Sequence, residues 1–489
     1  YTDWSQIESP SMRGEHNLHG LNLDWKRFMT HQTKDFLEHE IRSVHEIDPS
    51  LPTTHNFWDY IELGSGIDPY VVAQPIDIVS WDNYPIWDNP SVPNEEEALR
   101  RAFLHDLNRS MKQQPFLVME SSPSVMNWQE VAKLPRPGML ALSSLQAVAH
   151  GADGIGYFQW RKSLGSSEKF HGAVVDHYAT EKSRVFNEVK AVGNLLDNLG
   201  EVQAAMPQAQ VAIVYDLENA WAYYDSEGPL RDKISYFDVL IDHYSYFVEQ
   251  SIAVDVINHH MKLDPYKVVI APFLYLLSAS FAEEIKAFVQ RGGTFIAGPW
   301  TGIVDEHDLC YRNGRPGPIR DLLGIWVEET DALYPSEVLS IHAAGSKKKL
   351  PVASRLLDLI HTKGAVAGYF YADDFYAGYP ATTRNSYGKG KAIYLGFHST
   401  RDFLHHYYQD LFANENLGQI VSDLPAGIQI TYRQKAGRKY IFVLNFTDQV
   451  YELNLPWDCL KLLDESKLTK DSTLTIQPRN YEVLVVEET

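Results

Sequence analysis

Apolar and polar positions in residues 21–199 follow the helical period and the strand period in turn. Apolar residues recur at helical spacing in five segments, 21–47, 66–73, 94–111, 137–151 and 181–199. Four short apolar runs alternate with them: LPTTHNF (51–57), IDIVSWDNYP (76–85), PFLVME (115–120) and GIGYFQW (154–160). These runs are continuous, as expected for strands of a parallel sheet that helices cover. The pattern predicts four βα units in succession.

Polar and aromatic side chains follow each of the four predicted strands. They are His55 and Asn56, Asp82 to Tyr84, Glu120, and Gln159 to Arg161. In a βα barrel the carboxyl ends of the strands share one face, and active sites are built on that face. Four units make half of an eight-stranded barrel, so residues 1–203 are expected to form half of such a barrel.

A second α/β domain is predicted for residues 204–415, and a small antiparallel β domain for residues 416–489. The strands of the second domain are QVAIVYD, AVDVI, YKVVIAP and GTFIAG, spaced by helical segments in a doubly wound style. In the third domain the run IQITYRQKAGRKYIFVLNF alternates, and Gly437 marks a hairpin turn.

Charge and cysteine content exclude several classes of function. The net charge of −21 argues against a nucleic-acid surface, because phosphate contacts need clustered Lys and Arg. No apolar run is long enough for a membrane span. We therefore expect neither a nucleic acid nor a membrane as a partner. Cys310 and Cys459 lie far apart and form no zinc motif, which favours a reducing, cytoplasmic location. No GxGxxG or P-loop pattern is present, so we expect no nucleotide site and no cofactor. VDEHD (304–308) could bind a metal, but we interpret it as an exposed acidic loop and expect no metal.

Glu120 is the first candidate for chemistry. It ends the apolar run from Phe116 to Met119 and stands before a Ser/Pro/Asn loop. A carboxylate beside a buried strand is costly unless it is hydrogen-bonded or used, which makes it a site candidate. The alternative is a structural acid that pairs with a neighbouring Arg.

Aromatic residues gather near the same strand ends, and they are Trp81, Tyr84, Trp87, Trp128, Tyr157, Phe158 and Trp160. The apolar faces of sugars stack on such rings, while sugar hydroxyls need the donors and acceptors of Asp, Glu, Asn and His. The combination favours a carbohydrate site. The alternative is that the rings belong to the barrel core, a role that suits Phe158.

Glu168 and His171 are three residues apart in the loop GSSEKFHGAVVDHY (165–178). If this segment turns helically, the two side chains share a face. Two ligands alone are weak evidence for a metal, so we favour a hydrogen-bonding clamp on hydroxyl groups. A loop His is also often an ordinary surface residue.

Several blocks of the chain carry a specific resemblance. VSWDNYP, VMESSPSVMNWQ, PGMLALSSLQAVAHGADGIGYFQWRKSLGSSEKFHGAVV and TEKSRVFNEV resemble glycoside hydrolase family 42, the β-galactosidases with a (β/α)8 barrel. The likeness extends over the whole chain. It implies that residues 204–415 form a trimerisation domain, that the full protein is a homotrimer, and that a small C-terminal β domain follows.

The resemblance also implies site residues and a mechanism. Glu120 matches the catalytic nucleophile of a retaining enzyme that releases terminal β-D-galactose from β-galactosides. The residues that match the galactose subsite are Tyr84, Trp128, Glu168 and His171, with Phe158 beside them. In such enzymes a second, protonated carboxyl group about 5 Å away donates to the leaving oxygen.

The family's acid/base is a Glu in an Asn-Glu pair at the end of the fourth barrel strand. No Asn-Glu pair ends a predicted barrel strand of this chain, and the four units correspond to the fifth through eighth strands. We therefore expect a fragment that lacks the acid/base half of the barrel and activates a leaving group poorly by itself. Asp82 and Asp88 are weaker substitutes for the acid, and the alternative for Asp82, close to the strand end, is a hydrogen bond to a neighbouring loop backbone.

Two other functions stay open from the sequence. The chain could be a catalytically inactive carbohydrate-binding or assembly protein, in which the half barrel is a platform. It could also be a glycosidase of different specificity, a β-glucosidase or an α-L-arabinopyranosidase, because arabinopyranose keeps the hydroxyl pattern of galactose without the hydroxymethyl group.

Overall fold

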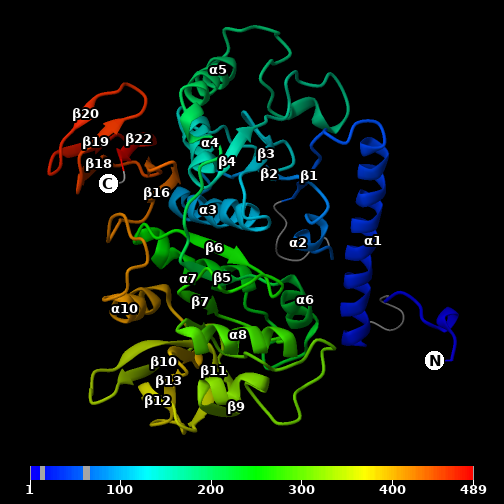
Figure 1. The fold of residues 1–489 in the computed structure, drawn as a ribbon, viewed down its shortest axis with the longest axis vertical. Coiled ribbons are helices and arrows are strands. Elements are labelled where there is room, and N and C mark those ends of the chain that lie inside the picture. The colour runs from blue at the N-terminus through cyan, green and yellow to red at the C-terminus, as the bar shows by residue number, and fades with distance from the viewer. Residues whose placement is uncertain (1, 11–16, 59–65, 488–489) are drawn as a thin grey trace.

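The computed structural model describes residues 2–10, 17–58 and 66–487, in which ten α-helices and four β-sheets are found (Figure 1). A short 3-10 helix, η1 (Trp4–Gln6), comes first. The long helix α1 (His19–His45) then stands beside the rest of the molecule, against α2 (Pro69–Val72) and α6 (Leu217–Asp225). None of the helices in the described ranges is long and apolar enough to cross a membrane.

The first sheet is parallel, and its four strands lie in the order of the sequence. They are β1 (Thr54–Phe57), β2 (Ile78–Asn83), β3 (Phe116–Ser121) and β4 (Ala152–Ile155). The helices that follow β2, β3 and β4 are α3 (Asn94–Ser110), α4 (Met139–Ala149) and α5 (Arg184–Asp197). Two 3-10 turns complete this part, η2 (Ser167–Phe170) and η3 (Gly200–Val202). The predicted alternation of strands and helices is therefore confirmed.

The fourth strand is shorter than the sequence pattern predicts. The run GIGYFQW was expected to be a strand, but β4 ends at Ile155 and the chain then leaves the sheet. Gly156 passes so close to β3 that a Cβ atom at this position would lie 2.3 Å from the Met119 carbonyl oxygen. Single hydrogen bonds, such as the one from Gly156 N to Val118 O at 2.7 Å, still join the two segments. Residues 156–160 consequently form a loop over the end of β3.

The second sheet has a parallel part with helices on both faces. Its order is β6-β5-β7-β8-β14, and the strands are β5 (Val211–Val214), β6 (Val254–Ile257), β7 (Val268–Ala271), β8 (Thr294–Ala297) and β14 (Gly390–Leu395). Alternate residues of β5 point to opposite faces. Val211 and Ile213 pack in one core with α7 (Tyr236–Glu249), while Ala212 and Val214 pack in another with α8 (Ala279–Arg291). This is the doubly wound arrangement that the sequence predicts.

An antiparallel extension of the same sheet was not predicted. It consists of β9 (Ile325–Ala332), β10 (Val338–Ala343), β11 (Leu350–Thr362), β12 (Val366–Tyr371), β13 (Pro380–Tyr387) and β15 (Phe397–Ser399). A short turn η4 (Gly317–Ile319) and helix α9 (Arg320–Leu323) precede it, and α10 (Arg401–Phe412) follows it. With these strands the sheet reaches eleven strands.

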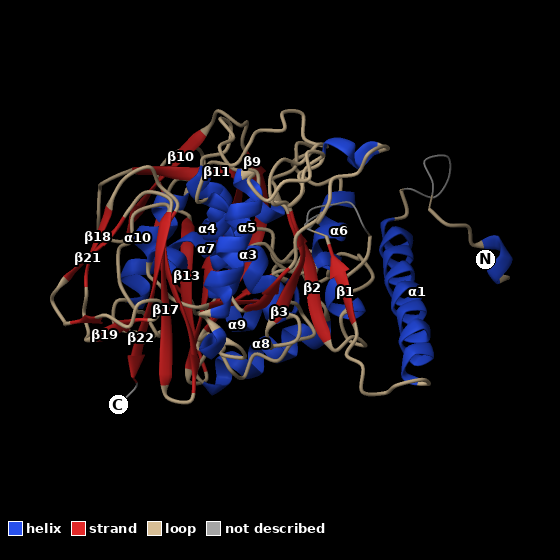
Figure 2. Cartoon of the chain, turned by 90° about the horizontal axis from the view of Figure 1, so that it is seen from above, coloured by secondary structure: helices blue, strands red, loops and turns tan. Residues whose placement is uncertain are grey.

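The third part is antiparallel, as predicted. Its larger sheet has the order β16-β17-β22-β19-β20, and β18 pairs with β21 in a smaller one. The strands are β16 (Ile428–Lys435), β17 (Arg438–Asn445), β18 (Tyr451–Asn454), β19 (Cys459–Lys461), β20 (Lys467–Leu468), β21 (Thr473–Ile476) and β22 (Asn480–Glu487). Gly437 has φ +80° in the turn between β16 and β17, which confirms the predicted hairpin. Figure 2 shows α3, α4 and α5 between the first sheet and strands β17 and β22.

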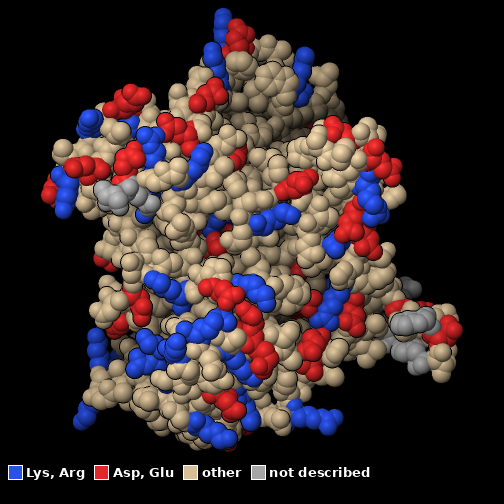
Figure 3. All heavy atoms as spheres, viewed as in Figure 1, with Lys and Arg blue, Asp and Glu red and all other residues tan. Residues whose placement is uncertain are grey.

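Buried and surface ion pairs join these parts. Arg109 of α3 is 3% exposed and pairs with Asp106 on its own helix and with Asp255 of β6, the latter at 2.9 Å. Near the surface, Arg401 of α10 bonds Glu96 of α3 at 2.8 Å and Asp242 of α7. On the face seen in Figure 3, acidic and basic side chains are likewise interspersed. The parts are therefore tied by charge as well as by apolar packing.

Candidate functional site

Glu120 lies near the carboxyl end of β3, where the sequence analysis placed it. Its strand is buried at Phe116 and Val118, whereas the Glu120 side chain is only partly buried. Tyr84, the residue after β2, donates a hydrogen bond from its hydroxyl to Glu120 Oε2 at 2.7 Å. Burial and this bond to Glu120 hold the pKa of the Tyr84 phenol well above its usual value, so the phenol stays a donor. The carboxylate is thus held by a neighbouring strand end.

A group of rings surrounds His171, which is fully buried. The indole of Trp128 stacks on its imidazole with ring centroids 4.7 Å apart and an angle of 15° between the planes. Tyr84 meets Trp128 edge to face at 4.9 Å, and Phe158 meets His171 at 5.2 Å. Trp128 itself is 49% exposed. The cluster therefore has a buried imidazole under an indole that reaches the surface.

The hydrogen bonds of His171 determine which ring nitrogen carries a proton. Asn127 Nδ2 donates to the Ser167 carbonyl at 2.6 Å, which turns Asn127 Oδ1 toward His171 Nδ1 at 3.2 Å. Glu168 Oε2 lies 3.7 Å from the same nitrogen. Because both neighbours are acceptors, Nδ1 carries the proton. Burial lowers the pKa of His171, so the neutral ring is favoured.

The structure brings together all six residues that the sequence and the resemblance single out. They are Glu120, Tyr84, Trp128, Phe158, Glu168 and His171. Glu168 lies in the turn η2, and His171 follows it, so the expected helical turn between them is observed. Asn127 was missed, although it lies in the quoted block VMESSPSVMNWQ. Only the polar type of the side chain and its place next to Trp128 could have indicated it.

Other aromatic residues from the sequence analysis lie away from this cluster. Trp81 is fully buried in the apolar core that also contains residues of α3 and α7. Trp87 stacks on Phe446 of the third domain, with ring centroids 5.6 Å apart. The hydroxyl of Tyr157 bonds Ser144 of α4 at 2.7 Å. Trp160 is 66% exposed at the surface. For Trp81 and Trp87 the core interpretation was the right one.

Asp82 lies opposite Glu120 in the pairing of β2 with β3. The side-chain amide of Asn56 donates hydrogen bonds to the Asp82 carboxylate. Both carboxylate oxygens accept from Asn56 Nδ2, at 2.9 and 3.1 Å. Both oxygens of Asp82 are thus engaged by a neighbouring side chain.

Metal-ligating side chains do not cluster at this site in the described part of the chain. Glu168 and His171 form a pair, whereas the one group of three potential ligands in that part, Glu218, His259 and His260, lies in the second domain. The loop residue Asp308, which was expected to be exposed, has a side chain that is 2% exposed.

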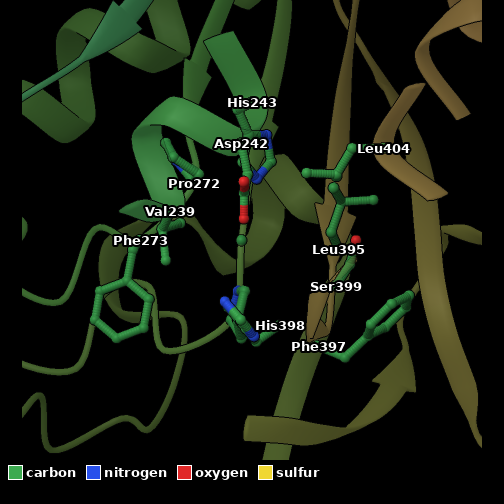
Figure 4. A pocket seen from close by; sticks show the side chains of 12 residues that line it. Val239, Asp242, His243, Pro272, Phe273, Leu395, Phe397, His398, Ser399 and Leu404 are labelled. Atoms are coloured by element: carbon green, nitrogen blue, oxygen red, sulfur yellow. The ribbon is translucent and has the colours of Figure 1, made fainter. Parts of the chain in front are cut away.

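A hollow between α7 and the ends of β7, β8 and β14 was considered as a second site (Figure 4). Its volume is about 10 Å³, which is the space of a single water molecule. His243 and His398 line it, and burial lowers their pKa values to about 3 and about 4. Both rings are neutral near pH 7, and the hollow is too small for a sugar.

Comparison with known proteins gives consistent matches along the chain. The family described as β-galactosidase matches residues 1–199, the β-galactosidase trimerisation domain matches residues 209–418, and the β-galactosidase C-terminal domain matches residues 427–487. These matches do not support the expectation that the chain is a fragment with half of a barrel, since the β-galactosidase family accounts for residues 1–199.

Individual relatives agree with these matches. β-Galactosidase Pbg of Clostridium perfringens is 45% identical over 99% of this chain and 71% of its own length. β-Galactosidase BglY of Alicyclobacillus acidocaldarius is 44% identical over 93% of this chain and 66% of its own length. The crystal structure of the β-galactosidase from Rahnella sp. R3 superposes with a TM-score of 0.94 at 43% identity, covering 100% of this chain and 71% of that one. The chain belongs to glycoside hydrolase family 42, the family of these β-galactosidases.

Proposed function

We propose that the protein is a retaining β-galactosidase that releases terminal β-D-galactose with Glu120 as the nucleophile. The observation that carries the proposal is the position of Glu120. Its carboxylate lies near the carboxyl end of β3, is bonded by Tyr84, and stands beside the buried His171 cluster. The relatives named as β-galactosidases support the choice of sugar.

The proposed reaction has two displacements. An oxygen of Glu120 attacks the anomeric carbon, the bond from that carbon to the leaving oxygen breaks, and the leaving oxygen takes both electrons and a proton from the acid. Water then attacks the same carbon, its proton passes to the conjugate base, and Glu120 leaves as a carboxylate. Tyr84 holds one oxygen of Glu120, so the other is the attacking atom.

The acid is assigned neither to Asp82 nor to Glu168. Both oxygens of Asp82 accept from Asn56, and Glu168 is needed as an acceptor for the sugar hydroxyls. A group that donates a proton in the first step has to be protonated before it. We therefore assign the acid/base role to no residue of strands β1 to β4, and the family resemblance implies a Glu of an Asn-Glu pair for that role.

The cluster around His171 is proposed as the galactose subsite. Trp128 offers an exposed apolar face for stacking, and Phe158 packs against His171 with 64° between the ring planes. Glu168 is the acceptor for a pair of sugar hydroxyls, because its side chain is 39% exposed. These side chains would bind hydroxyls that galactose and arabinopyranose share. An α-L-arabinopyranoside is therefore expected to be a second, slower substrate.

Trapping the covalent intermediate tests the nucleophile directly. A 2-deoxy-2-fluoro-β-galactosyl fluoride carries a leaving group that departs as fluoride without a proton donor. We expect one fluorogalactosyl group per chain, located by peptide mass spectrometry on Glu120, and no label on the Glu120→Gln variant. The Glu130→Gln variant, changed at an exposed carboxylate of the following loop, should label like the wild type. Label on another carboxylate would reject Glu120 as the nucleophile, and no label with an intact fold would favour a carbohydrate-binding protein.

We also propose that the protein assembles as a homotrimer. The match of residues 209–418 to a β-galactosidase trimerisation domain supports this state. Light scattering coupled to gel filtration should give three times the chain mass of 55.7 kDa. A monomer or dimer over the working concentration range would contradict the proposal.

A further inference from the structure

Three potential metal ligands meet at the carboxyl ends of β5 and β6 in the second domain. Glu218 lies in the first turn of α6, directly after β5, and His259 and His260 follow β6. The two strands pair in parallel with Val214 opposite Ile257, so the segments that follow them emerge side by side. One ligand atom from each of the three side chains lies within 4.8 Å of the others. In doubly wound sheets ligands bind beyond the carboxyl ends of the strands.

A buried carboxylate orients one of the two histidines. Asp216, which is 2% exposed, caps helix α6 and accepts from the Asn219 amide at 3.1 Å. Its second oxygen bonds His259 Nδ1 and also accepts from the His259 backbone amide at 3.3 Å. The ring orientation is thereby fixed, and Nε2 is left as the ligand atom. A carboxylate on the far nitrogen of a histidine is the usual second partner of a metal-bound imidazole.

The second histidine lies against the first. The ring centroids of His259 and His260 are 3.8 Å apart with 49° between the planes. Asn258 Oδ1 accepts from the His260 amide at 3.1 Å and holds the turn that brings the two rings together.

The charge around the group also favours a cation. Asp216 and Glu218 supply two carboxylates beside the rings, and Arg27 of α1 bonds Glu218. Both hydrogen bonds from Arg27 to Glu218 end on Oε2, one of them at 3.0 Å, and a third goes to Asp24. Glu218 Oε1 is therefore the oxygen that remains for an ion.

We propose that Glu218, His259 and His260 bind a divalent transition-metal ion, with Zn²⁺ as the natural choice. Two imidazoles and one carboxylate are a common zinc ligand set, with water in the remaining position. Ligands about 2.1 Å from a tetrahedral ion are spaced by about 3.4 Å, so small side-chain rotations from the present 4.8 Å limit complete the site. The ion would link α6 to the segment after β6 and, through Glu218 and Arg27, to helix α1.

Metal titration of the full chain tests this site without reference to galactosidase activity. After dialysis against a chelator and its removal, isothermal titration with ZnCl₂ should show one saturable site per chain. Co²⁺ should give the visible absorption of a His- and carboxylate-bound ion, and Zn²⁺ should displace it. The stoichiometry separates this site from weak binding by other histidines, of which the chain has 19 in total.

Matched histidine variants decide the location. His260 and His406 are both exposed, and His406 lies on α10 away from the group. His260→Ala should weaken Zn²⁺ binding by about 10-fold or more and abolish the Co²⁺ spectrum, while His406→Ala should change neither. A Glu218→Gln variant should weaken binding too, with melting curves as a check of folding. Equal binding by wild type and His260→Ala, or no saturable binding by the wild type, would overturn the proposal.

Discussion

The hydroxyl of Tyr84 donates to Glu120 Oε2 across 2.7 Å and joins the ends of the neighbouring strands β2 and β3. The bond has two physical consequences. It places the phenol donor of Tyr84 on the carboxylate that attacks the anomeric carbon in the proposed reaction. It also fixes the carboxyl plane, because one oxygen is engaged and the other remains for the substrate.

Replacing Tyr84 by Phe should therefore slow the proposed first displacement. The variant keeps the ring that packs edge to face on Trp128 and loses the donor to Glu120. A hydrogen bond to a charged group contributes about 1.5–3 kcal/mol, which corresponds to a loss of about 10- to 100-fold in kcat/KM. Rates with an aryl β-galactoside at several pH values measure it. An unchanged rate with the fold intact would show that Tyr84 does not assist Glu120.

Asn127 should prove to be a positioning residue for His171. An Asn127→Ala variant removes the acceptor for His171 Nδ1–H and the donor to the Ser167 carbonyl, so the ring and the η2 turn lose a common anchor. We expect KM to rise by about 10-fold or more, with a smaller change in kcat, since sugar binding depends on this orientation.

The matched variant Asn127→Asp retains an acceptor for His171 but cannot donate to Ser167. It should restore part of the lost affinity, and this recovery separates ring orientation from a general loss of structure. Equal KM values for Asn127→Ala and the wild type would contradict the role.

The strand ends could be predicted because their signal is local. A continuous apolar run that stops at Glu120 places the carboxylate near the rim of a parallel sheet, and the structure finds it there. The grouping of Glu168 with His171 follows from a spacing of three residues in one turn. Their catalytic and binding roles remain predictions, since the geometry shows proximity and not chemistry.

The features that were missed depend on distant partners. Asn127 is held by a carbonyl 40 residues further along the chain, and no local pattern encodes that contact. The long strand β11 (Leu350–Thr362) pairs with β9, β10 and β15, so its environment is set by three other segments. Trp87 follows a strand like a site residue, yet it is buried by a domain that begins more than 300 residues later.

Gly156 should be intolerant of any side chain. A Cβ atom there would lie 2.3 Å from the Met119 carbonyl oxygen and 3.1 Å from its carbon, and Met119 directly precedes Glu120. Because backbone rather than a flexible side chain is in the way, Gly156→Ala should displace the end of β3. We expect a loss of stability of about 1–3 kcal/mol and a larger loss of kcat than of thermal stability.

Gly154→Ala is the matched control two residues earlier. Its Cβ atom would approach only the tip of the Leu117 side chain, at 2.9 Å, which can rotate away. Thermal melting and turnover of both variants compare the two positions. Similar behaviour of Gly154→Ala and Gly156→Ala would mean that the close approach to Met119 does not constrain the nucleophile.

Asp308 should make the stability of the protein fall as the pH rises through the range from 4 to 6. Burial, which outweighs the attraction of His19 at 3.9 Å, raises the pKa of Asp308 to about 6. The folded state then binds more protons than the unfolded state between pH 4 and 6, so stability is lost over that window and stays lower above it.

The Asp308→Asn variant should remove this loss of stability and stabilise the protein by about 1–3 kcal/mol at pH 8. Asn also tolerates the φ of +57° at this position. Denaturant unfolding at pH 4.5 and pH 8 measures how the free energy of unfolding changes between the two pH values. The Asp305→Asn variant, on the same loop, is the control for replacing an Asp by an Asn. If Asp308→Asn and the wild type lost the same stability between the two pH values, the loss would belong to another group.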